Sequence, residues 1–299
     1  MSAVERLEPY RRLGNAPVDA IVAFLASQGA RRVGFELSGE FRTGVTALDL
    51  DGLRSGVPDA CDAGPLLRRQ LAVKSAAEVE RIERACQITG ASFAATLPSL
   101  EAGMTEREVG VLLTRAMTDA GAEGAWHWVA SGRGEYDRVD GVPRERPIER
   151  GDLVFVDMGA RVGGYWADFS RAAVIGAASD DQRRLQAEIA AITAIGVDAL
   201  RPGRSLGDAA ALIADAMDHA GLAFSANAGR FGHGLGMWAT EPPDLVVGSE
   251  VAIESGMVLT VEPATVTHEG MFHCEQNVVV TDVGPRILST APVDLIEVG

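Results

Sequence analysis

Residues 99–105 read Ser-Leu-Glu-Ala-Gly-Met-Thr, and residues 199–205 read Ala-Leu-Arg-Pro-Gly-Arg-Ser. In each copy a loop glycine precedes Thr or Ser, which can cap a helix, and an amphipathic run then ends at glycine. The same offset aligns Leu112 with Leu212. The alternative is chance similarity of two amphipathic helices, but one fixed offset favours duplication. Two copies do not make a solenoid, so they indicate a duplicated half-domain with a pseudo-two-fold axis.

Hydrophobic periodicity around this repeat indicates the order of the elements. Helices are expected at 76–97, 105–120, 180–200 and 205–220, and strands at 125–130, 153–158, 164–174, 224–228, 257–267 and 272–281. In each half the helices precede the strands, which is typical of an α+β fold rather than a doubly wound sheet. Residues 69–299 are therefore predicted as one domain. Residues 1–68 are predicted as a separate small α/β segment with a helix at 18–28, a strand at 32–36 and a Gly-, Asp- and Pro-rich remainder.

Charge and cysteine content narrow the possible partners. The formal charge of −15 argues against nucleic acid and anionic membranes. No apolar run is long enough to span a bilayer, and the N-terminus lacks a signal-peptide core. Cys61, Cys86 and Cys274 have no metal-like spacing, so we interpret them as reduced thiols in a cytoplasmic protein.

Five potential metal ligands lie in or beside apolar, strand-like runs, and four of them are carboxylates. They are Asp157, Asp168, His233, Glu262 and Glu275. A carboxylate in a buried strand is costly unless a positive group meets it, and the nearby Lys and Arg residues are too few. One Asp alone could be a turn cap, and residues 232–236 alone could cradle a phosphate. Five such accidents together are far less plausible than one metal site. Carboxylates with an imidazole suit two ions of Mn, Fe, Co or Zn.

The flanking motifs carry a family resemblance. His233 lies in Gly-His-Gly-Leu-Gly, Glu262 closes Gly-Met-Val-Leu-Thr-Val-Glu-Pro, and Glu275 opens Glu-Gln-Asn-Val-Val-Val. Residues 65–299 resemble the M24 "pita-bread" superfamily of methionine aminopeptidases, Xaa-Pro aminopeptidases, prolidases and creatinase. Residues 14–60 resemble only the end of the creatinase/prolidase N-terminal domain, most of which is expected to be missing.

The resemblance implies a duplicated pita-bread fold of α+β class and a ligand set of Asp, Asp, His, Glu and Glu. Asp157 is then expected to chelate one ion, Asp168 and Glu275 to bridge both, and His233 and Glu262 to complete one ion. Two such ions lower the pKa of a shared water and polarise a carbonyl oxygen. Glu262 is also the candidate general base.

Three positions depart from the peptidase pattern. Thr240 stands where a second histidine follows the ligand histidine, Val139-Asp140 lies about where a further histidine is usual, and His273 replaces an arginine. The two missing histidines handle the substrate in the peptidases, so their absence argues against ordinary aminopeptidase activity. The candidates to replace them are His127, His273 and Glu241.

Several aromatic residues lie beside the motifs. The candidate substrate-binding residues are Trp126, Trp128, Tyr165, Trp238 and Thr240. Core packing is an equally good interpretation of the aromatic ones, and of His127.

These observations predict a dinuclear-metal-dependent hydrolase that cleaves an amide or C–N bond in a small-molecule or short-peptide substrate. One alternative is a metal-dependent lyase, like the dimethylsulfoniopropionate lyases of the superfamily, and another is an ordinary Xaa-Pro aminopeptidase or dipeptidase. A non-catalytic binding protein is least favoured, because no ligand is lost. By resemblance we expect a homodimer.

Overall fold

The computed structural model describes residues 17–37, 44–136, 141–225 and 229–299, and the chain divides into two compact units, 1–69 and 70–299. The first unit contains α1 (Val18–Ser27), β1 (Arg32–Phe35), α2 (Ala47–Ser55), β2 (Asp59–Asp62) and the start of α3 (Gly64–Ala72). Strands β1 and β2 pair in parallel. The sequence prediction missed α2 and β2, although Thr46 caps α2 by accepting the Asp49 N–H at 3.2 Å.

The second unit has two halves that each begin with a helix pair. Its first half contains α4 (Ala76–Thr96), η1 (Leu97–Ser99), α5 (Glu106–Asp119), β3 (Gly124–Ala130), β4 (Leu153–Val162), β5 (Tyr165–Trp166) and β6 (Phe169–Ile175). Its second half contains α6 (Asp180–Ala199), α7 (Leu206–Ala220), β7 (His233–Gly234), β8 (Glu241–Asp244), β9 (Val258–Val261), β10 (Ala264–Thr267), β11 (Gly270–His273), β12 (Gln276–Thr281) and β13 (Gly284–Ile287). Strand β14 (Ile296–Val298) returns to pair with β6. None of the helices in the described ranges is long and apolar enough to cross a membrane.

The repeat in the sequence corresponds to a repeat in hydrogen bonding. Thr105 and Ser205 each form a capping box with the residue three positions later, at the start of α5 and α7. Each also forms an isolated antiparallel bridge to a distant segment, at Pro147 and at Ala252 respectively. The same local chemistry thus starts the second helix of both halves.

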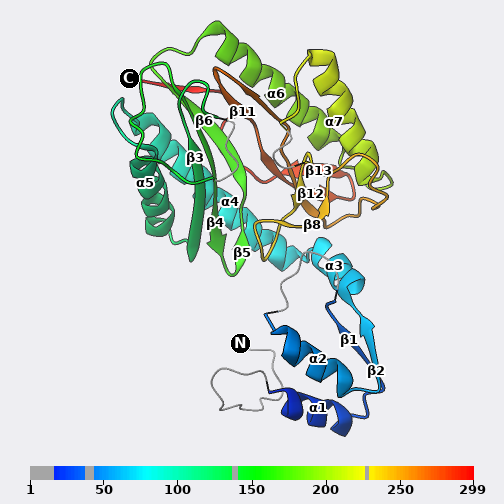
Figure 1. Ribbon diagram of the computed structural model, residues 1–299. Helices are drawn as coiled ribbons and strands as arrows, with labels where there is room; N and C mark the ends of the chain where they lie inside the picture. Colours follow the sequence, from blue (N-terminus) through cyan, green and yellow to red (C-terminus); the bar gives the residue numbers. More distant parts are fainter. Residues whose placement is uncertain (1–16, 38–43, 137–140, 226–228) are drawn as a thin grey trace. The chain divides into compact units, whose positions relative to one another are not determined.

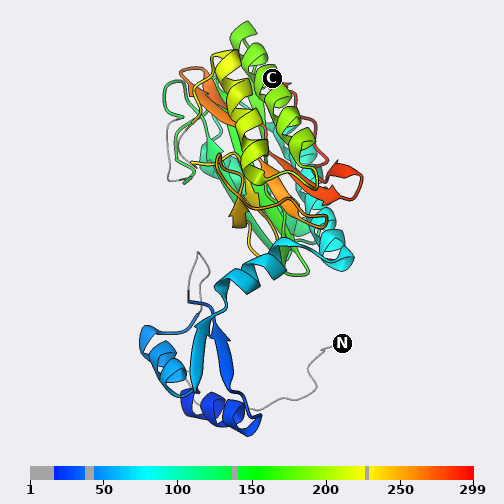
Figure 2. The same cartoon turned by 90° about the vertical axis from the view of Figure 1, so that its right-hand side faces the viewer.

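The strands of this unit lie between the two helix pairs, with α4 and α5 on one side and α6 and α7 on the other (Figures 1 and 2). The strand orders are β14-β6-β4-β3 and β13-β12-β9-β7-β8. Along β4, Val154 and Val156 pack into the core cluster of α4 and α5, whereas Leu153 and Phe155 pack into that of α6 and α7. Alternation along the strand therefore separates two cores.

Three of the predicted strands are interrupted, and a carboxylate lies at each interruption. Asp168 lies between β5 and β6, Glu262 between β9 and β10, and Glu275 between β11 and β12. Where the hydrogen-bond ladder of a strand is interrupted, side chains need not alternate between the two faces of the sheet. Each carboxylate can therefore point in a direction that its neighbours do not determine. The strand predicted at 224–228 is absent at residues 224–225, and residues 226–228 lie outside the described ranges.

Candidate metal centre

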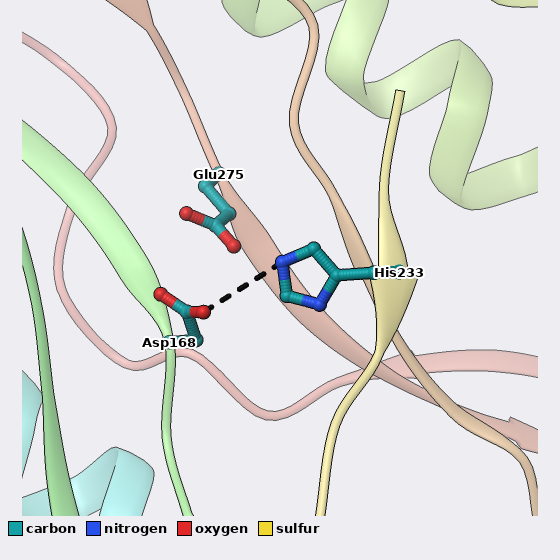
Figure 3. Close-up of side chains that lie close together, drawn as sticks. All are labelled: Asp168, His233 and Glu275. Atoms are coloured by element: carbon teal, nitrogen blue, oxygen red, sulfur yellow. Dashed lines mark ion pairs between the residues drawn. The ribbon is translucent and has the colours of Figure 1, made fainter. Parts of the chain in front are cut away.

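The structure brings the five predicted ligands together from both halves. Asp157 lies within β4 and Asp168 just before β6, whereas His233 lies in β7, Glu262 directly follows β9 and Glu275 directly precedes β12. Figure 3 shows the side chains of Asp168, His233 and Glu275 pointing toward one another. Single ligand atoms of these three residues lie within 4.8 Å of one another.

The distances within the group resemble those between ligands of one ion. His233 Nε2 lies 3.7 Å from Asp168 Oδ2 and 3.5 Å from Glu262 Oε1, too far for good hydrogen bonds. Two atoms that each lie about 2.0–2.2 Å from one ion at a tetrahedral angle are separated by about 3.3–3.6 Å. The spacing of His233 and Glu262 therefore fits donors that share a cation, and that of His233 and Asp168 is slightly longer.

All four carboxylates carry buried oxygen atoms that lack a hydrogen-bond partner among the described residues. These atoms are Asp157 Oδ1, Asp168 Oδ1, Glu262 Oε1 and both side-chain oxygens of Glu275. A buried, unsatisfied oxygen is costly, and an ionised one is more so. Bound cations would satisfy these atoms together, so the donor set fits a divalent-metal site.

Burial and mutual repulsion shift the carboxylate pKa values. Burial raises the pKa of Asp157 to about 6, and the neighbouring His273 partly opposes that rise. Burial and the surrounding carboxylates raise the pKa of Asp168 and of Glu275 well above their ordinary values. For Glu262 burial acts in the same direction, but His233 and His273 outweigh it and lower its pKa. Because ligands must be deprotonated, binding of a cation releases protons from this group.

The imidazole of His233 is oriented for coordination. Its Nδ1 lies 2.9 Å from the carbonyl oxygen of Gly234, which can only accept, so Nδ1 carries the proton. Nε2 is then the coordinating nitrogen, and it faces Asp168 and Glu262. The Thr260 hydroxyl oxygen accepts the backbone N–H of His233 at 3.0 Å and fixes the strand beside it.

Two supporting residues were missed at the level of sequence. Asn277 Oδ1 accepts the backbone N–H of Asp168 at 3.0 Å, and its amide nitrogen donates to the carbonyl of Asp168. Ser170 Oγ accepts the backbone N–H of Glu275 at 3.1 Å. Ser170 follows Asp168 by two residues, and Asn277 follows Glu275 by two residues. Side chains two residues apart in a strand lie on the same face, and this spacing could have identified both from the sequence.

The candidates on β3 divide between its two faces. Trp128 pairs with Asp157 in the register of β3 and β4, and Trp126 shares its face. Both indole N–H groups are buried, and neither has a hydrogen-bond partner in the part of the chain that the structure describes. His127 points to the opposite face, where its Nδ1 lies 3.2 Å from Thr114 Oγ1 on α5. There it lines a separate cavity of about 510 Å³ beside α5, so the structure does not bring His127 to the ligand group.

The remaining candidates lie in β5, in the loop after β7 and at the start of β8, and their surroundings differ. The side chains of Glu241 and Lys74 form a buried ion pair, with Lys74 Nζ 3.2 Å from Glu241 Oε2, and Glu241 Oε1 accepts the Trp238 N–H at 3.0 Å. Trp238 and Thr240 are exposed. The Tyr165 hydroxyl donates to Glu78, at the start of α4, at 2.8 Å. Glu241 is therefore held by Lys74, a residue that the sequence interpretation did not consider.

His273 does reach the ligand group, whereas Val139-Asp140 lies outside the described residues. His273 Nε2 is 3.6 Å from Glu262 Oε2, and its side chain is buried. Arg230 also approaches, with Nε 3.8 Å from Glu262 Oε1.

Comparison with known sequences shows related proteins over most of the second unit. The model of metallopeptidase family M24 matches residues 80–282. The uncharacterized peptidase YqhT of Bacillus subtilis is 34% identical over 229 residues, which are 75% of this chain and 64% of that protein. The Xaa-Pro dipeptidase of Pyrococcus furiosus is 28% identical over 226 residues, which are 75% of this chain and 65% of that protein. The chain thus spans slightly under two thirds of these relatives.

Comparison with solved structures extends the similarity to nearly the whole chain. The Xaa-Pro dipeptidase from Bacillus anthracis matches with a TM-score of 0.83 and 26% identity, over 96% of this chain and 79% of that one. The expected fold class, α+β with duplicated pita-bread architecture, is confirmed.

Proposed function

This chain belongs to metallopeptidase family M24, and we propose that it is a hydrolase that uses two divalent metal ions to cleave an amide or C–N bond in a small, peptide-like substrate. One observation carries the proposal. Four carboxylates converge with an imidazole, and among the described residues each carboxylate has a buried oxygen without a hydrogen-bond partner. A group that lacked a cation would not retain so many unsatisfied acceptors.

The charge of the group supports two ions rather than one. The four carboxylates carry a formal charge of −4 when ionised, and two divalent cations offset it. Arg230 Nε is 3.8 Å from Glu262 Oε1, too far for a hydrogen bond. We propose that Asp157, Asp168, His233, Glu262 and Glu275 hold the ions, and that the metal is Mn, Fe, Co or Zn, as this mixture of oxygen and nitrogen ligands favours.

When bound, such ions supply Lewis-acid activation of water and of the substrate carbonyl. Among the side chains, Glu262 is the best candidate to accept a proton, because His233 and His273 hold its pKa low and keep it ionised at neutral pH. Trp126 and Trp128 lie on the same face of the sheet as Asp157 and are candidates for the wall of the substrate site.

The substrate is proposed to be narrower than that of a general aminopeptidase. Thr240 is exposed, Glu241 is held by Lys74 and His127 faces away, so of the three candidates to replace the missing histidines only His273 reaches the ligand group. The names of the relatives support the plainer alternative, an ordinary Xaa-Pro dipeptidase.

Metal analysis and a substrate panel test both parts of the proposal. Protein stripped with a chelator and reloaded with each metal should contain two ions per chain and lose activity when stripped. Loss of one transition-state donor typically costs about a hundredfold or more in rate. Xaa-Pro dipeptides, Xaa-Pro tripeptides and Met-Xaa dipeptides should therefore be cleaved slowly by the loaded protein. Full activity of metal-free protein contradicts the metal proposal, and fast Xaa-Pro cleavage supports the ordinary dipeptidase.

We further propose that residues 1–68 belong to an N-terminal domain of the creatinase/prolidase type and that the chain forms a homodimer. The first proposal is supported by the division of the chain near residue 69 and by structural matches that cover 96% of the chain. Light scattering tests the second, and a monomer at working concentration contradicts it.

A further inference from the structure

His273 occupies a position in the ligand group that the five predicted ligands do not explain. It ends β11, two residues before Glu275, and its side chain is buried. Single ligand atoms of Glu262, His273 and Glu275 lie within 4.8 Å of one another. This second group shares Glu275 with the group of Asp168 and His233, and among the described residues neither group contains both imidazoles.

Hydrogen bonding around Ser170 determines which nitrogen of His273 carries a proton. Ser170 Oγ donates its single proton to the carbonyl oxygen of His273 at 2.9 Å. Ser170 Oγ must then act as an acceptor toward His273 Nδ1, which lies 2.7 Å away. Nδ1 therefore bears the proton, and Nε2 is the nitrogen that is free to coordinate. Metal-binding histidines commonly have this arrangement, in which the second nitrogen is held by an outer partner.

The position of Nε2 fits coordination better than a hydrogen bond. It lies 3.6 Å from Glu262 Oε2, beyond hydrogen-bond range, but at the separation expected for two ligands of one ion. The other oxygen of the same carboxylate, Oε1, lies 3.5 Å from His233 Nε2. Glu262 thus faces one imidazole with each of its oxygens.

Packing holds the ring of His273 in this orientation. Phe155 meets it edge to face, with ring centroids 5.5 Å apart and an interplanar angle of 80°. The ring is therefore held by Ser170 at Nδ1 and by packing against Phe155, while Nε2 lies 3.6 Å from Glu262 Oε2. A ring held on two sides loses little further entropy on coordination.

We propose that His273 Nε2 is a sixth protein ligand of the metal centre, at the position lined by Glu262 and Glu275. The proposal rests on the proposed function. It gives each of the two ligand groups one imidazole, so the position beside His273 should favour nitrogen-accepting Fe, Co or Zn over Mn.

Cobalt binding to the full-length protein tests this inference. Metal-free wild type and His273→Gln are titrated with Co²⁺ by calorimetry, and X-ray absorption of the loaded samples counts imidazoles per cobalt. Wild type should bind two ions with one imidazole each on average. His273→Gln should weaken one of the two binding steps by about tenfold or more and halve the imidazole count.

Two further variants control for folding. His268→Gln changes an exposed histidine of the same β10–β11 hairpin and should leave both binding steps unchanged. Ser170→Ala keeps the imidazole but releases Nδ1, and should weaken the same step as His273→Gln by about tenfold. In His273→Gln the unaffected step, assigned to the group of His233, reports an intact fold.

The outcomes separate the inference from the function on which it rests. If wild type binds two ions but His273→Gln keeps both affinities and the imidazole count, the inference is overturned and the proposed function stands. If wild type binds fewer than two ions, the dinuclear function itself fails, and the inference fails with it.

Discussion

In the first half of the 70–299 unit, β4 runs unbroken for ten residues and carries Asp157 within it, whereas the corresponding region of the second half is divided into short strands. On the unbroken β3–β4 pair, side chains alternate between the two faces of the sheet. Trp128 therefore lies on the same face as Asp157, and His127 lies on the opposite face. In the second half Glu262 and Glu275 lie at breaks, where alternation no longer applies. The two halves therefore share their helices and helix caps. They differ in where their strands are interrupted, and those interruptions position Glu262 and Glu275.

The largest effect is expected on removing Asp168, the ligand of the first half that lies between two strands. Asp168→Ala should lose at least one ion and reduce kcat/KM by about a thousandfold or more, because one carboxylate is expected to serve both ions. Elemental analysis and peptide hydrolysis measure the two effects. Asp119→Asn, at an exposed carboxylate of α5, is the matched control. Two retained ions in Asp168→Ala would show that neither ion depends on Asp168.

The next test concerns the connection between the halves. Lys74 precedes the first helix of the first half, and its ammonium pairs with buried Glu241 in the second half. Lys74→Met leaves that carboxylate buried without its cation, and we expect a loss of about 3–5 kcal/mol in the free energy of unfolding. Urea denaturation measures the loss. The double variant with Glu241→Gln should recover part of it, and equal stability of Lys74→Met and wild type would argue that the ion pair is unimportant.

A third test uses the raised pKa of Asp157, the ligand on the unbroken strand of the first half. Burial raises the pKa of Asp157 in the folded chain from 3.8 to about 6. The folded state therefore binds this proton more tightly than the unfolded state. The resulting stability is fully present below the unfolded pKa and is lost as the pH rises through about 6. Metal-free protein should be less stable at pH 7 than at pH 4, by about 2–3 kcal/mol from this residue alone.

Denaturation of chelator-treated protein between pH 4 and 7 measures this dependence. Asp157→Asn should reduce the slope, because the amide does not titrate, and Asp168 and Glu275 should account for the remaining dependence. Metal loading should reverse the trend, since cations bind the ionised carboxylates. A metal-free protein that gains stability toward neutral pH would show that the carboxylates are already compensated.

The smallest effect is expected at the histidine on the far face of β3. His127 contacts α5 rather than the ligand group. His127→Gln should therefore change kcat/KM by less than about threefold, or roughly 0.7 kcal/mol. His233→Gln, at a ligand of the second half, is the contrasting variant and should abolish metal-dependent activity. A large loss in His127→Gln would place the cavity beside α5 in the reaction after all.

The sequence predicted most of the helices correctly because their signals are local. An acidic residue follows Thr105 and Ser205 by three positions, and this pattern predicts a helix cap. Both caps are present in the structure. The predicted strand at 257–267 was too long because apolar content alone does not reveal where a ladder breaks. Helix α2 was missed because its nine residues include Gly and two Asp and bury only Leu53, so they show no clear apolar face. The cap at Thr46 is its main local signal.

The sequence by itself determined the duplicated scaffold and the residue types of the ligand group, since caps, periodicity and uncompensated carboxylates are properties of short segments. Only the tertiary structure decided which way the other candidates face. His127 and Trp128 are neighbours, yet strand pairing sends them to opposite faces. Lys74 and Glu241 are 167 residues apart, and only the packed chain brings them to a hydrogen bond. The orientation of His273 likewise depends on Ser170, 103 residues away, because long-range contacts determine which nitrogen of an imidazole meets a ligand group.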